Sequence, residues 1–461
     1  MEPLVLQLAR FVTAAEFEDL SPEAVEQLKI RILDALGCAI GAVEGDPVKI
    51  VRKHVKDLGG RPVCSLIGGG RTSPEHAAFY NSALVRYLDF NDSYLAKGET
   101  CHPSDNLGAI LAASEYRGGT GSDLILALAI AYQVQCRLSD EAPVRAKGFD
   151  HTTQGSYAAA AGVAKALELD IEQTAHAIAI AGTAYNALRV TRTGELSHWK
   201  GLAYPNTAFG VIHGAFLAME GITGPLEVFE GNKGFMDSIA GPFEIDWDSE
   251  NLERVTRTII KRYNAEIHSQ SVLEGIFELK DREKFLPYEI ERIEIDIFDV
   301  AYHIIGGGEE GPKTTIRTKE EADHSLQYLV SVGLLDGEVT PAQFQPERIV
   351  ADDVQTLLTK VIVRPSSAYS RRFPEELPAM IAVHLRGGEV LRIEKTDYEG
   401  FFTRPMSWES VERKFNRLAS PFLSERLRRE WMQVIRDLEI VDLSDLTELF
   451  RRVHLVKLRA A

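Results

Sequence analysis

One short stretch of the chain gathers carboxylate, hydroxyl and imidazole groups at the density that a proton-transfer site needs. Asp89, Asp92 and Ser93 stand together, and His102 and Ser104 follow closely. Side chains of these types can accept, donate or orient a proton during a reaction. They can equally be helix caps and solvated turn residues, and the stretch alone leaves both interpretations open.

The pattern around this stretch predicts a loop between two helices. Ser73-Pro74-Glu75 is typical of a helix start, and helical apolar spacing continues to Leu88. Asp89 is therefore expected at the helix end, with Asp92 and Ser93 on the same face if the helix continues that far. Loops held between packed helices often carry function.

A turn at 102–105 is expected to lead into the next helix, capped by Ser104 or Asp105. Further helical patterns fill the chain up to about Gly221. Small residues are frequent in them, which suits closely packed helices. The first long helix is expected to begin at Ser21-Pro22, and the others cover these ranges: 122–137, 153–167, 171–188 and 207–219.

Strand patterns begin only near residue 285. The range 288–300 alternates as a half-exposed strand does, and 359–364 is a second strand candidate. The ranges 379–385 and 390–394 flank Arg386-Gly387-Gly388-Glu389, which predicts a hairpin. A helix is expected over 320–335, and helical patterns return from Ser407.

We therefore predict a mainly α protein with a large discontinuous all-helical domain and a smaller α+β lid domain. The predicted helical domain covers 1–268 and 405–461, and the lid covers 269–404. A length of 461 residues favours two domains over one core. The cleft between two domains is the default place for a ligand.

Composition restricts the class of protein. Apolar residues make up 45% of the chain, yet no apolar run approaches the roughly 20 residues that span a bilayer. Met1-Glu2-Pro3 does not read as a secretory signal, so we expect a cytoplasmic protein without a membrane partner. The net charge of −17 disfavours nucleic acid as a partner. An anionic substrate would need a local basic pocket.

Three further stretches concentrate polar groups near helix ends. His151 precedes an alanine-rich helix, where it could cap, pack or catalyse. Arg192 and Lys200 belong to a group of cations that stands out in so acidic a chain, and a guanidinium suits carboxylate capture. Lys261 follows two isoleucines, so we expect a partly buried setting for it.

The last polar stretch, Asp323-His324, lies inside the predicted helix 320–335. Asp323 could orient His324, but adjacent residues of a helix do not face each other, whereas Tyr328 can share the face of His324. No metal motif, phosphate loop or nucleophile elbow is found in the sequence. The remaining acids, imidazoles, lysines, tyrosine and arginine suit acid–base chemistry on a carbonyl or carboxylate compound.

Five stretches, spread over most of the chain, resemble the MmgE/PrpD family, whose members include 2-methylcitrate dehydratase and cis-aconitate decarboxylase. The matching residues are Asp89-Phe90-Asn91-Asp92 with His102-Pro103-Ser104; Trp199-Lys200-Gly201 with Asn206; Lys261 with Ala265; Ala322-Asp323-His324-Ser325 with Tyr328; and Pro405-Met406-Ser407-Trp408. The resemblance implies a helical domain with an α+β lid, a homodimer, and no need for a metal or other cofactor.

By motif position the resemblance also implies active-site residues. These are Asp89, Ser93, His102, His151, Lys200, Lys261 and Tyr328. Ser93 stands where relatives often carry threonine, and the match around His151 is loose. We add Arg192, Asp92 and Ser104 as candidates for substrate binding.

The expected activity is a metal-independent hydro-lyase that dehydrates 2-methylcitrate or a similar tricarboxylate. Removing a proton beside a carboxylate builds further negative charge there, so cations must be placed beforehand, and Lys200 and Lys261 are candidates. His102 or His151 could serve as proton donor or base, and Asp89 could orient the histidine. The alternatives are a cis-aconitate decarboxylase, an amino-dicarboxylate epimerase, or an organic-acid-binding protein without turnover.

Overall fold

The computed structural model describes residues 2–194 and 196–456. Two compact units divide the chain. The helical unit comprises Met1–Thr191, Gly201–Ile260 and Ser407–Ala461, and the α+β unit comprises Arg192–Lys200 and Lys261–Met406. The predicted fold class, mainly α with a smaller α+β part, is confirmed. The predicted boundaries of independently folding domains stay a prediction.

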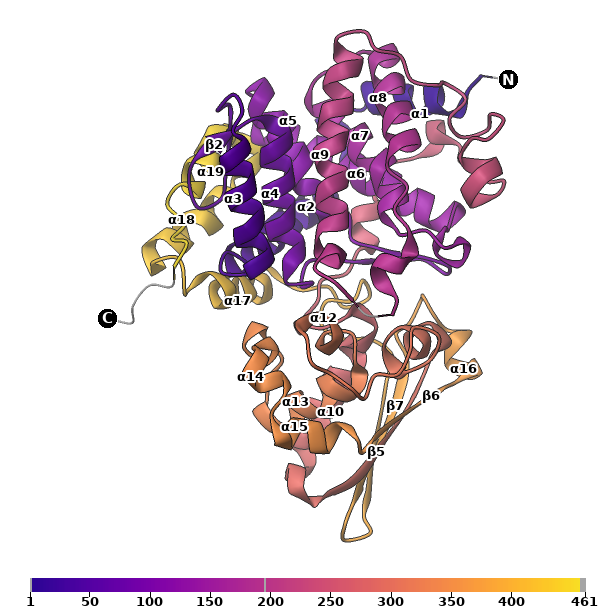
Figure 1. Cartoon of the computed structure of the whole chain (residues 1–461), viewed down its shortest axis with the longest axis vertical. Helices are drawn as coiled ribbons and strands as arrows, with labels where there is room; N and C mark the ends of the chain where they lie inside the picture. Colours follow the sequence, from indigo (N-terminus) through magenta and orange to yellow (C-terminus); the bar gives the residue numbers. More distant parts are fainter. Residues whose placement is uncertain (1, 195, 457–461) are drawn as a thin grey trace. The chain divides into compact units, whose positions relative to one another are not determined.

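The helical unit is a layered assembly of long helices. Its N-terminal helices are α1 (Leu4–Ala14), α2 (Pro22–Gly41), α3 (Asp46–Leu58), α4 (Pro74–Tyr87), α5 (Leu107–Arg117), α6 (Gly121–Glu141), α7 (Thr152–Ala166) and α8 (Ile171–Ala184). Figure 1 shows α3, α4 and α5 side by side, and α7 packs against both α6 and α8. Ser21 caps α2 by accepting from the Ala24 amide, as predicted.

The C-terminal segment returns to the N-terminal helices of this unit. It contains α17 (Trp408–Ala419), α18 (Glu425–Arg436) and α19 (Leu443–Phe450). Helices α17 and α18 pack on α2, and α19 contacts α5 (Figure 1). The two ends of the chain therefore form one core.

Small residues set the spacing of the central helices. A Cβ on Gly162 of α7 would lie 2.8 Å from the carbonyl oxygen of Ala127 on α6. A Cβ on Gly155 would lie 2.4 Å from the ring of Tyr204. Since carbon atoms cannot approach so closely, α7 needs glycine at both positions, as the alanine- and glycine-rich pattern indicated.

Helix α9 (Trp199–Met219) begins in the segment that belongs to the α+β unit and continues in the helical unit. It is longer than the predicted helix 207–219. Pro205 lies inside it, and proline is a poor residue for a helix interior because it lacks the amide donor. Because of Pro205, the first turns of α9 were not predicted from the local sequence.

Short strands occur earlier in the chain than we expected. Each has two residues: β1 (Cys64–Ser65) pairs with β2 (Arg71–Thr72), and β3 (Tyr94–Leu95) pairs with β4 (Thr100–Cys101). The expectation of no strand before residue 285 is wrong in this respect, because two residues are too few to show an alternating pattern. The hairpin β3–β4 lies within the polar stretch 89–106.

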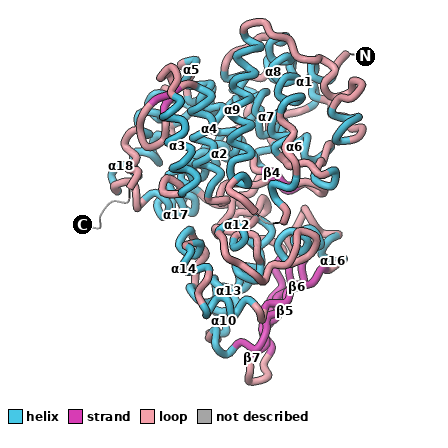
Figure 2. Tube along the Cα trace, viewed as in Figure 1, coloured by secondary structure: helices cyan, strands magenta, loops and turns pink. Residues whose placement is uncertain are grey.

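The α+β unit is built on a mixed sheet with strand order β6-β5-β7-β8. Figure 2 shows these strands in magenta. The strands are β5 (Ile290–Ile297), β6 (Val361–Pro365), β7 (Ala379–Leu385) and β8 (Val390–Lys395). Strand β5 pairs in parallel with β6 and antiparallel with β7, and β7 and β8 form the predicted hairpin. Alternate residues of β5, among them Ile293, Ile295 and Ile297, are buried.

Helices cover the sheet and surround it. They are α10 (Gln270–Glu283), α11 (Asp299–Ala301), α12 (Lys319–Ala322), α13 (Leu326–Asp336), α14 (Pro346–Ile349), α15 (Asp352–Leu358) and α16 (Ser367–Ser370). Helix α10 packs on β7, β8 and α13. The single helix predicted over 320–335 is wrong, since α12 ends at Ala322 and α13 begins only at Leu326.

Candidate active site

In the helical unit, helix α4 ends before the polar stretch that the sequence singled out. Its last residue is Tyr87, and Asp89 has a left-handed backbone with φ 54°. Aspartate tolerates this conformation better than most residues. The helix therefore does not continue, so the condition under which Asp92 and Ser93 would share a helical face with Asp89 is not met.

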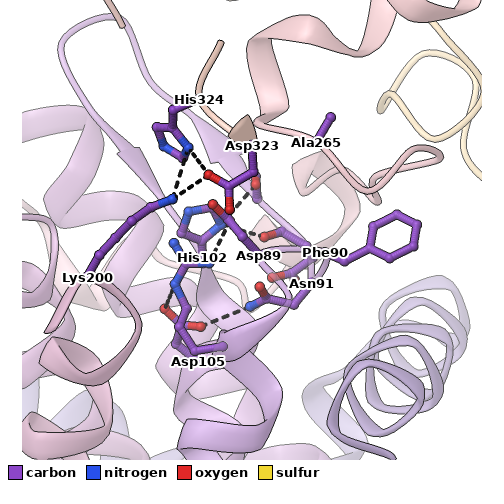
Figure 3. A network of polar contacts seen from close by, with 12 residues as sticks. Asp89, Phe90, Asn91, His102, Asp105, Lys200, Ala265, Asp323 and His324 are labelled. Atoms are coloured by element: carbon purple, nitrogen blue, oxygen red, sulfur yellow. Dashed lines mark hydrogen bonds and ion pairs between the residues drawn. The ribbon is translucent and has the colours of Figure 1, made fainter. Parts of the chain in front are cut away.

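A buried arginine holds the start of this loop. Arg86 Nη1 donates to Asp89 Oδ1 at 2.6 Å, and its Nε lies 3.6 Å from Asp105 Oδ2. The Asn91 amide donates to Asp105 Oδ1 and to Ser104 Oγ, both at 2.9 Å. Figure 3 shows Asn91 beside Asp105. These contacts join the segment around Asp89 to the short helix η2 (Pro103–Asn106).

Asp92 is bonded to the protein through both carboxylate oxygens. Oδ1 accepts from the Ser104 amide at 3.0 Å, and Oδ2 accepts from the Tyr132 hydroxyl at 2.6 Å. Burial raises the pKa of Tyr132, and the charge of Asp92 raises it further. Ser104 and Asp105 do not cap α5, for which Asn106 is the N-terminal flanking residue. A role of Asp92 and Ser104 in substrate binding stays a prediction.

The contacts of His102 define its protonation at one nitrogen. Nδ1 lies 2.8 Å from the carbonyl oxygen of Asp92 and 3.0 Å from Ser93 Oγ. Because a carbonyl oxygen only accepts, we assign the proton of the neutral ring to Nδ1. Nε2 then carries the lone pair, which is the arrangement that a general base requires.

His151 lies next to His102 within the helical unit. The two ring centroids are 5.2 Å apart, and the rings meet edge to face at 88°. His151 precedes α7, and its Nδ1 lies 3.1 Å from Asp150 Oδ1. Asp150 is fully buried, and its Oδ2 lies 3.9 Å from Arg189. Two imidazoles with different Nδ1 partners, a carbonyl and a carboxylate, therefore face each other.

Two tyrosines near these histidines, Tyr204 and Tyr132, were not predicted from the sequence. The Tyr204 hydroxyl donates to Asn106 Oδ1 at 2.6 Å, and its ring lies 6.5 Å from that of His151. Burial raises the pKa of Tyr204. Tyr132 and Tyr204 lie far from the stretch in sequence, on α6 and α9, and no local pattern marks them. Arg86 could have been suspected, as a lone cation in an apolar helical pattern.

In the α+β unit, Asp323 is the centre of a cluster of charged side chains. Lys200 Nζ donates to Asp323 Oδ1 at 2.7 Å, and Lys319 Nζ donates to Oδ2 at 2.8 Å. His324 Nδ1 lies 2.6 Å from Asp323 Oδ1 and 2.9 Å from Lys200 Nζ (Figure 3). Burial disfavours ionisation of Asp323, but Lys200, Lys319 and His324 outweigh it and hold its pKa well below the usual range.

The break between α12 and α13 makes this cluster possible. Ser325 starts α13 by accepting from the Tyr328 amide at 3.1 Å, so Asp323 and His324 lie outside both helices. Asp323 and His324 can therefore face each other, contrary to the expectation for an unbroken helix. Asp323 and Lys319 are thus additional polar residues that we did not select as site residues from the sequence.

The other predicted cations of this unit are buried. Lys261 is completely buried, and Arg192 is 7% exposed and donates to the Lys200 carbonyl oxygen at 2.8 Å. Near Lys261, Glu266 pairs with His268 Nδ1 at 2.7 Å. Burial opposes ionisation of Glu266, yet the charge and hydrogen bond of His268, together with the charges of His324 and Lys261, lower its pKa to about 2.

Tyr328 lies in the hydrophobic core of the α+β unit. It packs in a cluster with Leu329, Phe344 and other apolar residues. Its hydroxyl donates to the backbone carbonyl of Gln343. Burial raises the pKa of this phenol. The hydroxyl thus has a structural partner, and a catalytic role for Tyr328 stays a prediction.

The ten residues that we selected from the sequence therefore fall into two groups, one in each unit. Asp89, Asp92, Ser93, His102, Ser104 and His151 belong to the helical unit, and Arg192, Lys200, Lys261 and Tyr328 to the α+β unit. Within either unit alone, the described residues show no set of three metal-ligand atoms from histidine, cysteine or acidic side chains within 4.8 Å. The expectation of a metal-free site stays a prediction.

Two family models cover most of the chain. Residues 6–248 match the MmgE/PrpD N-terminal domain, and residues 263–440 match the MmgE/PrpD C-terminal domain. No helix in the part of the chain that the structure describes has the length and apolar character to cross a membrane.

Named relatives include two kinds of enzyme. A 2-methylcitrate dehydratase of Salmonella typhi is 28% identical over 84% of this chain and 81% of its own length. The mitochondrial 2-methylcitrate dehydratase of Yarrowia lipolytica is 26% identical over 82% of this chain and 76% of its own length. The cis-aconitate decarboxylase of Mus musculus is 26% identical over 96% of this chain and 92% of its own length.

Proposed function

The chain belongs to the MmgE/PrpD family, and from this premise we propose that it is a hydro-lyase that dehydrates 2-methylcitrate or a closely related citrate-like tricarboxylate. The product is an alkene of the cis-aconitate type. The observation that carries the proposal is the pair of facing imidazoles, His102 and His151, whose Nδ1 atoms have different partners.

The reaction needs two proton positions. A base takes the proton from the carbon beside a carboxylate, and the released electron pair forms the carbon–carbon double bond. The carbon–oxygen bond to the neighbouring hydroxyl breaks, and the departing hydroxide takes a proton from an acid and leaves as water. One group must therefore be unprotonated and another protonated when substrate binds.

The two histidines meet this requirement in our proposal. The Asp92 carbonyl on Nδ1 fixes the tautomer of the neutral ring of His102, with the lone pair on Nε2, so we assign it the role of base. The carboxylate of Asp150 beside Nδ1 favours the protonated ring of His151, so we assign it the role of acid. Ser93, bonded to His102, and Asp89, held by Arg86, complete this part of the proposed machinery.

Cations of the α+β unit fit the other requirement of the reaction, which is the binding of an anion whose charge increases in the transition state. Lys200 and Lys319 share one carboxylate, so this cluster keeps one positive charge in excess before any charge on His324. We assign Lys200, Lys261 and Arg192 to the substrate carboxylates. Cations that are placed before the reaction stabilise developing charge without further reorganisation.

A second candidate activity is decarboxylation of cis-aconitate. The observation that favours it is the similarity to the mouse decarboxylase, which extends over 96% of this chain. In that reaction the carbon–carbon bond to a carboxylate breaks, carbon dioxide leaves, and the remaining electron pair takes a proton. The same cations and one protonated imidazole would suffice.

The test is to incubate the protein, after dialysis against a chelator, with 2-methylcitrate, citrate and cis-aconitate separately. Proton NMR of the products and absorbance of new conjugated alkene are followed. Alkene from 2-methylcitrate supports the dehydratase, and carbon dioxide from cis-aconitate moves the assignment to the decarboxylase. Binding of all three acids without turnover would contradict both activities and favour a binding protein.

We also propose that the protein is a homodimer, that it acts in the cytoplasm and that it needs no metal. Light scattering after size exclusion measures the mass against that of the 461-residue chain. Activity that is lost on chelation and restored by a divalent ion would contradict metal independence.

A further inference from the structure

A buried lysine of the C-terminal segment reaches the loop that follows α4. Lys414 of α17 is 8% exposed. Its Nζ donates to the carbonyl oxygen of Phe90 at 2.7 Å and lies 2.6 Å from Asp34 Oδ1 on α2. The same ammonium lies 3.8 Å from the centroid of the Phe90 ring. The ammonium of Lys414 thus contacts both the backbone carbonyl and the aromatic ring of Phe90.

The bound carbonyl belongs to the peptide bond between Phe90 and Asn91. Asp89 has the left-handed backbone conformation described above, and Ser93, three residues after Phe90, accepts from and donates to the backbone of Ile259. A hydrogen bond from an ammonium to the Phe90 carbonyl fixes the orientation of the peptide between these two points. The direction in which Asp89 and Ser93 present their side chains depends on that orientation.

Charge explains why a lysine is suited to this position. Asp34 and Asp92 are both buried and raise each other's energy when both are ionised. Burial raises the pKa of Asp34, and Lys414 is the first of the groups that oppose this effect. Lys414 therefore offsets the buried acids while it holds the loop.

We propose that Lys414 is a positioning residue for the reaction, which holds the Asp89–Ser93 loop in the geometry that His102 and Ser93 need. This inference rests on the proposed function. It assigns to the segment 407–456 a part in the activity, although its residues lie more than three hundred positions from the loop in sequence.

Removing first the charge of Lys414 and then that of Asp34 separates the effect of Lys414 on loop geometry from its effect on stability. Lys414→Met leaves Asp34 buried without its cation and is expected to destabilise the helical unit. The double variant Lys414→Met/Asp34→Asn removes both charges and should recover much of the lost thermal midpoint. It does not restore a donor to the Phe90 carbonyl. Lys414→Arg keeps a cation that can donate to both groups.

The chain offers a matched control on α2, the helix that carries Asp34. Lys29 of α2 is also buried, donates to the Arg436 carbonyl oxygen at 2.6 Å and pairs with Glu439 at 2.8 Å. The double variant Lys29→Met/Glu439→Gln removes the same kind of link between α2 and the C-terminal segment. Among the described residues, the hydrogen bonds and the ion pair of Lys29 lead to Arg436 and Glu439 and not to the loop, so turnover should stay within about twofold of wild type.

Three quantities are measured for each variant: thermal midpoint, hydrogen exchange of a peptide covering 89–93, and kcat with KM. We expect Lys414→Met/Asp34→Asn to exchange this peptide at least about tenfold faster and to lose about 10- to 100-fold in kcat, with KM within about threefold. Lys414→Arg should recover part of kcat.

Wild-type exchange and wild-type kcat in the double variant, at a restored midpoint, would show that Lys414 only stabilises the fold and would overturn the inference. The exchange measurement needs no substrate. If the wild type turned over none of the three acids, the proposed function would be contradicted. If the 89–93 peptide of Lys414→Met/Asp34→Asn exchanged at the wild-type rate, this inference alone would be contradicted.

Discussion

Replacing Asp323 with asparagine is the perturbation that most directly tests the charge cluster of the α+β unit. Asp323 is completely buried and binds two ammonium groups, Lys200 at 2.7 Å and Lys319 at 2.8 Å. Asparagine keeps the shape but removes the charge. Its amide can still accept one hydrogen bond, while its NH2 group would face a lysine that also donates.

The size of the effect follows from the burial of the partners. The side chain of Lys200 is 4% exposed and that of Lys319 is 16% exposed. Removing one partner of a buried ion pair costs about 3–5 kcal/mol, because the remaining charge stays desolvated. We expect the lower part of this range, about 3 kcal/mol, since Lys319 can turn toward water. Loss of orientation at Lys200 should lower kcat/KM by about 100-fold.

The assay compares Asp323→Asn with Asp353→Asn, a control in the same unit. Asp353 pairs with Arg348, but its side chain is 51% exposed, so its removal should cost less than about 1 kcal/mol. Calorimetry and hydrogen exchange of α13 report on the unit, and kcat/KM reports on activity. Equal, small effects of the two substitutions would refute the reasoning, because the burial of the Asp323 cluster would then carry no energetic weight.

Three shorter predictions address other parts of the molecule. Tyr328→Phe removes the donor to the buried Gln343 carbonyl and should cost about 1–3 kcal/mol of stability with kcat within about twofold; a large fall in kcat at unchanged stability would instead establish the catalytic role. Since the pKa of Glu266 is lowered from 4.5 to about 2, the stability it contributes is present above about pH 4.5 and lost as the pH falls toward 2. The difference in unfolding free energy between wild type and Glu266→Gln, about 3 kcal/mol at neutral pH, should shrink over that window, and a constant difference would contradict the pairing. Gly121→Ala places a Cβ 1.8 Å from the Leu438 carbonyl oxygen and should lower the thermal midpoint, whereas an unchanged midpoint would show that the backbone at Leu438 can move.

Long periodic elements were predictable from the sequence because their apolar spacing is set by the element itself. The β7–β8 hairpin is an example: two alternating segments flank Gly387-Gly388, and Gly388 adopts φ 88°, which glycine tolerates. The start of α2 is another, since Ser21 and Pro22 are both typical of a helix start and both occupy those positions.

Breaks inside apolar patterns were not predictable. The spacing of apolar residues runs through 320–335, so the interruption between α12 and α13 leaves no trace in periodicity. It depends on Ser325, whose hydroxyl starts a new helix by accepting from the Tyr328 amide. His324 lies just before this cap and outside both helices.

Contacts between residues far apart in the chain also could not be predicted from the sequence. Motif residues such as Asp89 and His102 were found because they stand close together in the chain. Other residues of the same stretch have partners on three separate helices: Asp92 binds Tyr132, the Phe90 carbonyl binds Lys414, and Asn106 binds Tyr204. Only the folded chain shows which buried polar side chain meets which, because burial makes such pairing necessary without specifying the partner.

The most direct test of the proposed acid–base function is turnover of 2-methylcitrate by His102→Asn beside the wild type, with the stability of both proteins measured. Asparagine can keep a donor near the Asp92 carbonyl, where Nδ1 now lies 2.8 Å away, and lacks Nε2. Our account predicts a fall in kcat of about 10²- to 10⁴-fold with the thermal midpoint nearly unchanged. A variant that keeps wild-type turnover at wild-type stability would contradict the role of His102 as the base.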